Sequence, residues 1–268
     1  MRQPILKIMI VMFVSIFVGD NLQAEGLTAP GKGILSLSRH LEIFEDKNGH
    51  LGVLELPKDR SHWVGHGRDA ALMFGFSRST FWVRFALDHA GDEKQQIVIE
   101  SLDPSSDFIE IFVFDKRGRL LANVKSGDQT ESFSINAKNI RNRYPAFLVE
   151  LTEPVDIYVS LKGRSPLKFD LQLANPDNFY DRRLHDFGLN LMVLGIGIFL
   201  FFYNLFLYIQ VRETVYIPYL LTVVSVQMCI LASNGFCRVL FPDNTYLPNT
   251  GLCIFTYVSI IGGSWVNI

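Results

Sequence analysis

Short segments of alternating apolar and polar residues fill the chain from residue 25 to residue 183. In "FWVRFAL", Phe81, Val83, Phe85 and Leu87 fall on one face, because successive side chains of a strand point to opposite faces. Similar segments are "LSLSRHLEI", "FIEIFVF", "AFLVEL", "VDIYVSL" and "LKFDLQL", with turn residues between them. Such segments are typical of antiparallel sandwiches. We therefore predict an all-β, jelly-roll-like sandwich over residues 25–183, with no helix before residue 184.

Three long apolar runs follow the predicted sandwich, at residues 187–211, 214–236 and 250–268. None of them contains a formally charged residue. An α-helix rises about 1.5 Å per residue, so about 20 apolar residues cross the core of a bilayer. A buried helix of a soluble protein would explain any one run, but three in succession favour membrane spans. We predict α-helical transmembrane segments 1, 2 and 3 at these positions.

The first 24 residues have the three parts of a secretory signal peptide. Arg2 and Lys7 form a basic start, residues 8–18 are apolar, and Ala24 offers a small residue for cleavage. The apolar part is too short to cross a bilayer, although an uncleaved N-terminal anchor is the alternative. Export of the segment after Ala24 makes the sandwich periplasmic and sends the first span inward. We therefore predict a multi-pass protein of the bacterial inner membrane.

Composition narrows the functional classes. Hydrophobic residues make up 49% of the chain, and the mean hydropathy is +0.21. A net charge of −2 gives no electrostatic basis for nucleic-acid binding. The three cysteines, Cys229, Cys237 and Cys253, all lie in the C-terminal third. The exported part therefore has no disulfide bond and depends on its apolar core.

Trp82 and Arg84 are candidate ligand-binding residues, because they point away from the apolar face of "FWVRFAL". An aromatic ring beside a guanidinium suits a sugar, since the ring stacks on apolar faces and the guanidinium donates to hydroxyls. The alternative is that Trp82 packs under a neighbouring loop, with Arg84 stacked across an aromatic ring.

The segment "SHWVGHG" adds His62, Trp63 and His66 as candidates for lining a ligand cleft. Two histidines four residues apart hold a metal when they share a helix face. Gly65 and Gly67 disfavour a helix here, so we expect a loop with solvated histidines and no metal site or cofactor.

The acidic residues Asp103, Asp107 and Glu110 are close together in the sequence. Glycoside hydrolysis needs a pair of carboxylates, but the same segment reads as an ordinary turn followed by a strand. Asp103 also stays a ligand candidate, including for calcium. No phosphate-binding loop, nucleophile elbow or kinase signature is present. We therefore expect no enzymatic activity in these residues.

Two stretches together resemble a known family. They are "STFWVRFALDH", preceded by "LEIFEDKNGHLG", and "FFYNLFLYIQVRETVYIPYLLTVV", followed by "NGFCRVLFPDN". They resemble the bacterial seven-transmembrane receptors with diverse intracellular signalling modules, with a type 2 extracellular domain. The resemblance implies a jelly-roll-like ectodomain that binds carbohydrate or a related small ligand. It also implies seven helices and a cytoplasmic diguanylate cyclase, histidine kinase or phosphatase, so the chain looks like a truncated receptor with three of the seven spans.

The sequence thus predicts a sensory receptor that binds a small, carbohydrate-like ligand and contacts membrane lipid. We expect the segment 173–186 to couple the sandwich to the first span. The alternative is a membrane-anchored module that docks a periplasmic protein, and a homodimer is also compatible with the sequence.

Overall fold

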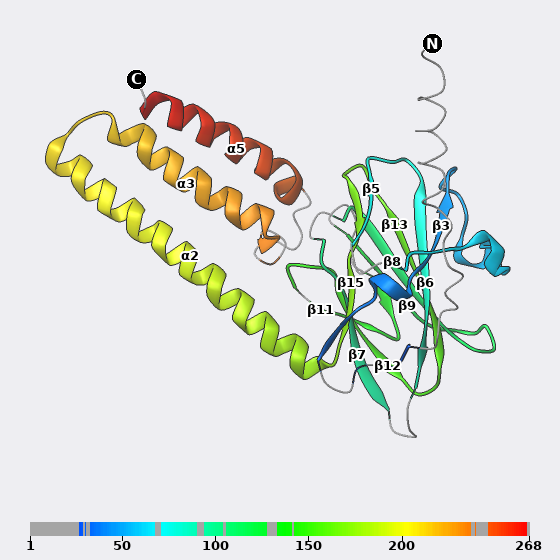
Figure 1. The fold of residues 1–268 in the computed structure, drawn as a ribbon. Helices are drawn as coiled ribbons and strands as arrows, with labels where there is room; N and C mark the ends of the chain where they lie inside the picture. Colours follow the sequence, from blue (N-terminus) through cyan, green and yellow to red (C-terminus); the bar gives the residue numbers. More distant parts are fainter. Residues whose placement is uncertain are drawn as a thin grey trace, which may run out of the picture.

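A computed structural model describes most of the chain after the predicted signal peptide, which lies outside the described residues. The described residues are 27–28, 30, 33–67, 71–89, 94–103, 106–127, 133–140, 142–236, 239 and 246–266. They form a β-sandwich followed by three long helices (Figure 1). The predicted fold class, an all-β sandwich ahead of apolar helices, is confirmed.

The larger sheet has eight strands. Its order is β10 (Phe133–Ile135), β9 (Leu120–Ser126), β8 (Phe108–Asp115), β13 (Val155–Lys162), β6 (Thr80–Asp88), β3 (Glu42–Asp46) and β4 (Val64–Gly65), and β1 (Leu27–Thr28) pairs in parallel with the end of β6. The other ladders in this sheet are antiparallel.

The smaller sheet has five antiparallel strands. Its order is β11 (Lys138–Ile140), β12 (Ala146–Leu151), β7 (Gln95–Ser101), β15 (Leu171–Ala174) and β2 (Ile34–Ser36). A separate pair joins β14 (Leu167–Phe169) to β5 (Leu72–Gly75). Three short 3₁₀ helices interrupt the strands: η1 (Ser38–His40), η2 (Val53–Glu55) and η3 (Arg60–His62).

The inner faces of the two large sheets meet in one apolar core. All four apolar residues of the predicted "FWVRFAL" face of β6 lie in it. Ile97 and Ile99 of β7 and Phe147 of β12 pack there from the other sheet and are fully buried. Burial of this surface provides the main stabilisation of a domain that has no disulfide bond.

The segment "LSLSRHLEI" is not one strand. Its first part is β2 in the five-stranded sheet and its last part enters β3 in the eight-stranded sheet, with η1 between them. The alternation still holds, because Leu37 and Leu41 are buried and Leu35 and Ile43 pack against the same core. The pattern therefore indicated which side chains face inward but not where the chain changes sheets.

Helix α2 (Pro176–Val211) begins within the segment expected to be a linker and continues without a break into the first predicted span. The prediction of no helix before residue 184 is therefore wrong. The side chain of Asn175 accepts a hydrogen bond from the backbone N–H of Asn178 at 2.9 Å, and Pro176 occupies the first turn. Both are helix-start signals. The sandwich is therefore joined to the first predicted span by a continuous helix and not by irregular chain.

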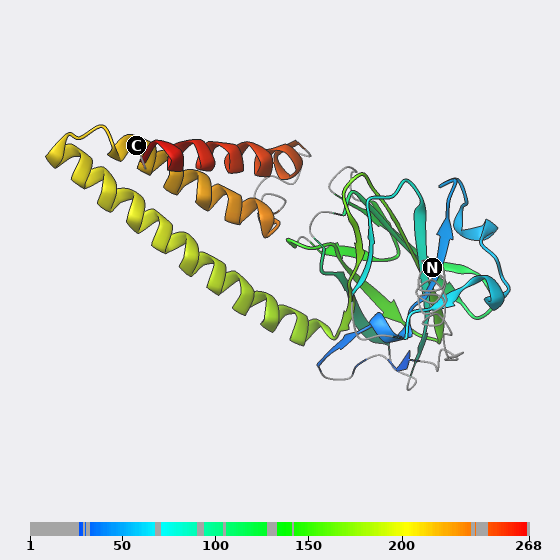
Figure 2. The ribbon, with the colours of Figure 1, turned by 45° about the horizontal axis from the view of Figure 1, so that its top comes forward.

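Helices α3 (Tyr216–Ser233) and α5 (Tyr246–Val266) run beside each other and extend with α2 from one side of the sandwich (Figures 1 and 2). The backbone of Gly262 approaches α3 so closely that an added Cβ would lie 2.4 Å from the Thr222 hydroxyl. By length and composition, α2 and α3 are able to cross a membrane, whereas the apolar part of α5, Cys253–Gly262, is shorter. The three predicted span positions stay predictions.

Replacing Gly127 with Ala should destabilise the sandwich by roughly 1–3 kcal/mol, the usual range for overpacking. Gly127 has φ +154°, and an added Cβ would lie 1.9 Å from the carbonyl oxygen of Asp107. Gly65→Ala is the matched control, because nothing lies within 4 Å of its added Cβ. Urea unfolding followed by tryptophan fluorescence measures both variants, and equal midpoints would contradict this packing.

Candidate functional site

A loop covers part of the outer face of the eight-stranded sheet. It carries η2 and η3 between β3 and β4, and Trp63 near its end packs against Trp82. The Trp63 indole N–H donates to the Pro57 carbonyl oxygen at 2.9 Å and so holds the loop in place. The cluster beneath the loop contains Phe44, Val53, Leu56, Trp63, Trp82, Phe112 and Tyr158. Trp82 is 3% exposed and Trp63 7%, so neither indole offers an open stacking face.

Arg84 lies at the margin of this cluster. Its guanidinium carbon is 4.4 Å from the centre of the Trp63 ring, and its Nε donates to the Glu42 carboxylate. Its Nη2 is buried and has no hydrogen-bond partner among the residues that the structure describes. A buried charged donor without a partner is costly, so this atom is a candidate for contact with a ligand.

A cavity of about 120 Å³ opens beside Arg84. It is lined by Glu42, Arg60, Arg84, Phe85, Ala86, Asp156 and Tyr158. Typical small-molecule sites measure about 300–1,000 Å³, so this cavity accommodates a single functional group and not a chain of sugar rings.

Asp59 anchors the 3₁₀ turn that carries Arg60. Its carboxylate accepts hydrogen bonds from the Ser61 hydroxyl at 2.6 Å and from the Ser61 backbone N–H at 3.1 Å. These two donors hold the pKa of Asp59 below its usual value. The carboxylate therefore stays ionised at neutral pH and keeps the turn, with Arg60, at the cavity.

The sequence-predicted candidates fall into two groups. Trp63, Trp82 and Arg84 meet on the outer face of the larger sheet, and Arg84 alone of the six candidates lines the cavity. His62 is exposed on η3, and the backbone N–H of His66 donates to the Leu41 carbonyl oxygen at 3.0 Å. Within the described part of the chain, no group of three or more His, Cys, Asp or Glu residues is arranged to hold a metal ion.

The acidic candidates lie away from this cavity and are engaged in local structure. Asp103 is buried and accepts from the Ser106 hydroxyl at 3.4 Å. Asp107 is buried and accepts from the backbone N–H groups of Arg164 and Ser165. Glu110 accepts from the Asn123 side chain at 3.2 Å. They therefore support turns and strands within the sandwich.

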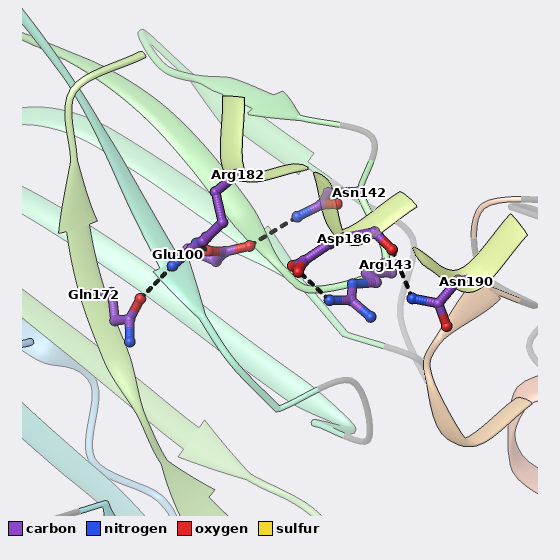
Figure 3. A network of polar contacts seen from close by, with 7 residues as sticks. All are labelled: Glu100, Asn142, Arg143, Gln172, Arg182, Asp186 and Asn190. Carbon is purple, nitrogen blue, oxygen red and sulfur yellow. Dashed lines mark hydrogen bonds and ion pairs between the residues drawn. The ribbon is translucent and has the colours of Figure 1, made fainter. Parts of the chain in front are cut away.

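A second polar cluster joins the sandwich to α2 (Figure 3). Glu100 of β7 is buried and forms an ion pair with Arg182 of α2. Asn142 donates to the same carboxylate at 2.9 Å, and Arg182 also donates to the Gln172 side-chain oxygen at 2.6 Å. Every partner in this cluster is therefore charged or dipolar, which is what a buried carboxylate requires.

An apolar contact lies beside these polar ones. Phe179 of α2 is 1% exposed and packs on the outer face of the five-stranded sheet. Its cluster contains Val98, Ile140, Ala146, Ala174 and partly buried Leu148. The first turns of α2 are thus held against the sheet by both apolar burial and an ion pair.

Arg143 contacts the first long helix and a residue that follows the second. Its guanidinium pairs with Asp186 of α2 at 2.7 Å and lies 6.0 Å from the ring of Phe236, just after α3. Phe236 in turn contacts Phe187 of α2 with ring centres 5.7 Å apart. One loop of the sandwich therefore contacts α2 and the segment that follows α3.

Sequence patterns did not single out Glu100, Arg143 or Arg182. An acidic residue inside the otherwise apolar strand "QIVIE" was the available signal, because a buried carboxylate requires a partner. The "NPDNF" start of α2 was a second signal, since it carries the Asn cap and the Pro of a helix N-terminus.

The described residues thus form an all-β domain whose outer face carries a small polar cavity, followed by long apolar helices. Residues 38–175 match the family model described as 7TMR-DISM extracellular 2. The chain belongs to this family, as the sequence resemblance indicated. It is thus a membrane receptor protein with an extracellular N-terminal domain. Among curated protein sequences, none matches the chain.

Two solved structures illustrate the structural comparisons. CsCBM6-3 from Clostridium stercorarium, in complex with cellobiose, is 9% identical, and the match covers 57% of this chain and 99% of that one with a TM-score of 0.27. A β-1,3-glucan-binding CBM6 from Bacillus halodurans is 10% identical, with 56% and 98% covered and a TM-score of 0.26. These scores are too low to bear on fold or ligand.

Replacing Arg182 with Met should release the first turns of α2, because it leaves the buried Glu100 carboxylate without its cation. Breaking a buried pair in this way costs about 3–5 kcal/mol. The double variant Glu100→Leu with Arg182→Met should cost less, since both charges are removed. Hydrogen–deuterium exchange of the amides of residues 177–186 measures the release.

Lys116→Met is the control for this experiment. It breaks the exposed ion pair with Asp156, which measures 2.6 Å, and such pairs contribute about 1 kcal/mol or less. If Arg182→Met leaves exchange in residues 177–186 as slow as in this control, the ion pair does not hold the helix.

Proposed function

We propose that the chain is the sensing part of a receptor in the bacterial inner membrane. The periplasmic sandwich binds a small, carbohydrate-like ligand, and the helices carry the effect of binding to the cytoplasmic side. Family membership supports this function, because extracellular domains of these receptors are thought to bind carbohydrate or a related ligand.

The observation that carries the proposal is the docking of α2. This helix runs for 36 residues without interruption. Its first turns pack on the five-stranded sheet through Phe179 and the Glu100–Arg182 pair, and its remainder is apolar. A displacement of the sheet therefore moves the helix as a rigid body, since no irregular segment lies between them to absorb the motion.

Ligand binding shifts this arrangement only if the ligand prefers one pose of the sandwich over another. A change from 1:99 to 99:1 between two poses needs about 10⁴-fold tighter binding to the favoured pose. The loop around Arg84 and the docked face around Glu100 lie on different sheets of one packed core. Rigid packing of that core is the route by which binding at one sheet affects the other.

We assign no reaction to the chain. The carboxylates of Asp107 and Glu110, which glycoside hydrolysis would require, are engaged by Arg164, Ser165 and Asn123. Their hydrogen bonds support a structural role and leave ligand binding as the function of the sandwich.

Docking of a periplasmic protein is the second candidate function. Met73 of β5 is 78% exposed and Phe76 just after it is 80% exposed. Exposed apolar side chains close together suit a protein partner. Cross-linking in native membranes from photoreactive residues at these two positions tests this candidate, and a single recurrent protein product would favour it.

A panel of neutral and acidic mono- to tetrasaccharides should contain at least one ligand that binds the full chain in detergent micelles. Calorimetry measures the binding, and thermal shift measures the stabilisation that a ligand of the folded state must produce. Absence of both effects across the panel would remove the carbohydrate part of the proposal.

Insertion of two glycines between Phe187 and Gly188 should leave ligand binding intact and abolish the ligand-dependent movement of α2, because it breaks the continuous helix. Electron–electron distance measurements between labels at Lys138 and Arg212 follow that movement, in a chain whose cysteines are changed to serine. The same insertion after Arg212 is the control and should preserve the shift. A shift that survives insertion at residue 187 would argue against relay through α2.

A further inference from the structure

Two arginines and two carboxylates line the cavity beside Arg84, and they differ in whether they have an ion-pair partner. Both of its carboxylates already have a cation: Glu42 pairs with Arg84, and Asp156 pairs with Lys116 at 2.6 Å. Arg60 is exposed and has no ion-pair partner among the described residues. Arg84 still has the buried Nη2 without a partner. The cavity is thus lined by one arginine that has no ion-pair partner in the described part of the chain, Arg60, and by one whose Nη2 has no hydrogen-bond partner there, Arg84.

We propose that this cavity receives the carboxylate of an acidic sugar. The inference rests on the proposed ligand-binding function and names the chemical class of the ligand. A guanidinium presents its N–H donors in a planar fork that matches a carboxylate. The incoming oxygen atoms accept from the Arg84 guanidinium, and the charge of the carboxylate is balanced by Arg60.

Size and charge favour a carboxylate over bulkier anions. The cavity volume of about 120 Å³ admits one small group, with the rest of the sugar outside. Glu42 and Asp156 also line the cavity, and their negative charges disfavour a doubly charged phosphate more than a singly charged carboxylate. The phenol of Tyr158, which lines the same cavity, can donate to a hydroxyl of the sugar.

The loop is built to keep Arg84 in this position. The guanidinium is stacked 4.4 Å from the Trp63 ring, and Trp63 is itself fixed by its hydrogen bond to Pro57. A side chain held on two sides loses little freedom on binding, so more of the contact energy appears as affinity. The buried tryptophans thus support the site from below, without contacting the sugar.

The test compares sodium glucuronate with glucose, which lacks the carboxylate, by calorimetry on the full chain in detergent micelles. We expect saturable binding of glucuronate and at least tenfold weaker binding of glucose, the usual range for a lost charge-assisted hydrogen bond. Sodium acetate should compete with glucuronate, and sodium sulfate should compete less well.

Two variants have opposite expected effects. Arg60→Gln removes the unpaired cation and should weaken glucuronate binding several-fold. Glu42→Gln frees the Arg84 guanidinium from its carboxylate and should tighten glucuronate binding, whereas a neutral sugar that uses Glu42 as an acceptor would bind less tightly. Arg78→Gln, an exposed arginine that does not line the cavity, should leave binding unchanged. None of the three requires substitution of the packed Arg84.

The outcomes separate this inference from the proposed function. Equal binding of glucose and glucuronate, or a weakening of both by Glu42→Gln, overturns the carboxylate site while the receptor function stands. A third outcome is that a different saccharide of the panel binds with an affinity that none of the variants changes. That result would place the ligand outside the cavity, and it would overturn this inference but not the proposed receptor function. Binding of no saccharide at all removes the inference together with the carbohydrate function.

Discussion

The buried carboxylate of Glu100 constrains how the sandwich and the helices are joined. A charge this deeply buried requires a cation, and that cation is Arg182, two turns into α2. The pairing fixes which face of α2 meets the five-stranded sheet and how far along the helix the contact lies. Phe179, one turn earlier, can pack against Val98 and Ile140 only in that orientation.

Both sheets of the sandwich have covered outer faces, but the covers differ. The five-stranded sheet lies under a helix that continues toward the predicted membrane span. The eight-stranded sheet lies under a loop held by aromatic packing, with a small polar cavity at its margin. Helix α2 can transmit a displacement because it is continuous. The loop over the eight-stranded sheet can bind a ligand because loops present side chains from several directions.

Regular alternation made much of the sandwich predictable. In β6 every second residue is apolar and faces the core. The residues between them, such as Trp82 and Arg84, lie on the outer face of the sheet, where the loop covers Trp82. In β7 the alternation is lost, since Val98 and Glu100 on the outer face are buried under α2. Strands covered on both faces lose the period-two signal, and this is why β7 was not among the predicted strands.

The site was less predictable than the fold. Sequence alone placed Trp82 and Arg84 on one face, but the burial of Trp82 depends on the loop that lies between β3 and β4. The cavity depends on β3, β6, β13 and η3 meeting in space. Arg60 and Asp156 are distant in sequence, and no local pattern connects them. Which charged side chains line one cavity is decided by the tertiary fold, so the structure was needed to identify them.

The unbroken length of α2 has a mechanical consequence. From Arg182 to its end at Val211 the helix measures roughly 45 Å, at about 1.5 Å per residue. If the docked turns tilt by about 5°, the far end moves by roughly 4 Å, close to the rise of three residues. Arg143 also contacts Phe236, just after α3, so such a tilt pivots near one loop of the sandwich. A sub-ångström adjustment of the sheet is thereby enlarged to the scale of a side chain at the opposite end of the bundle.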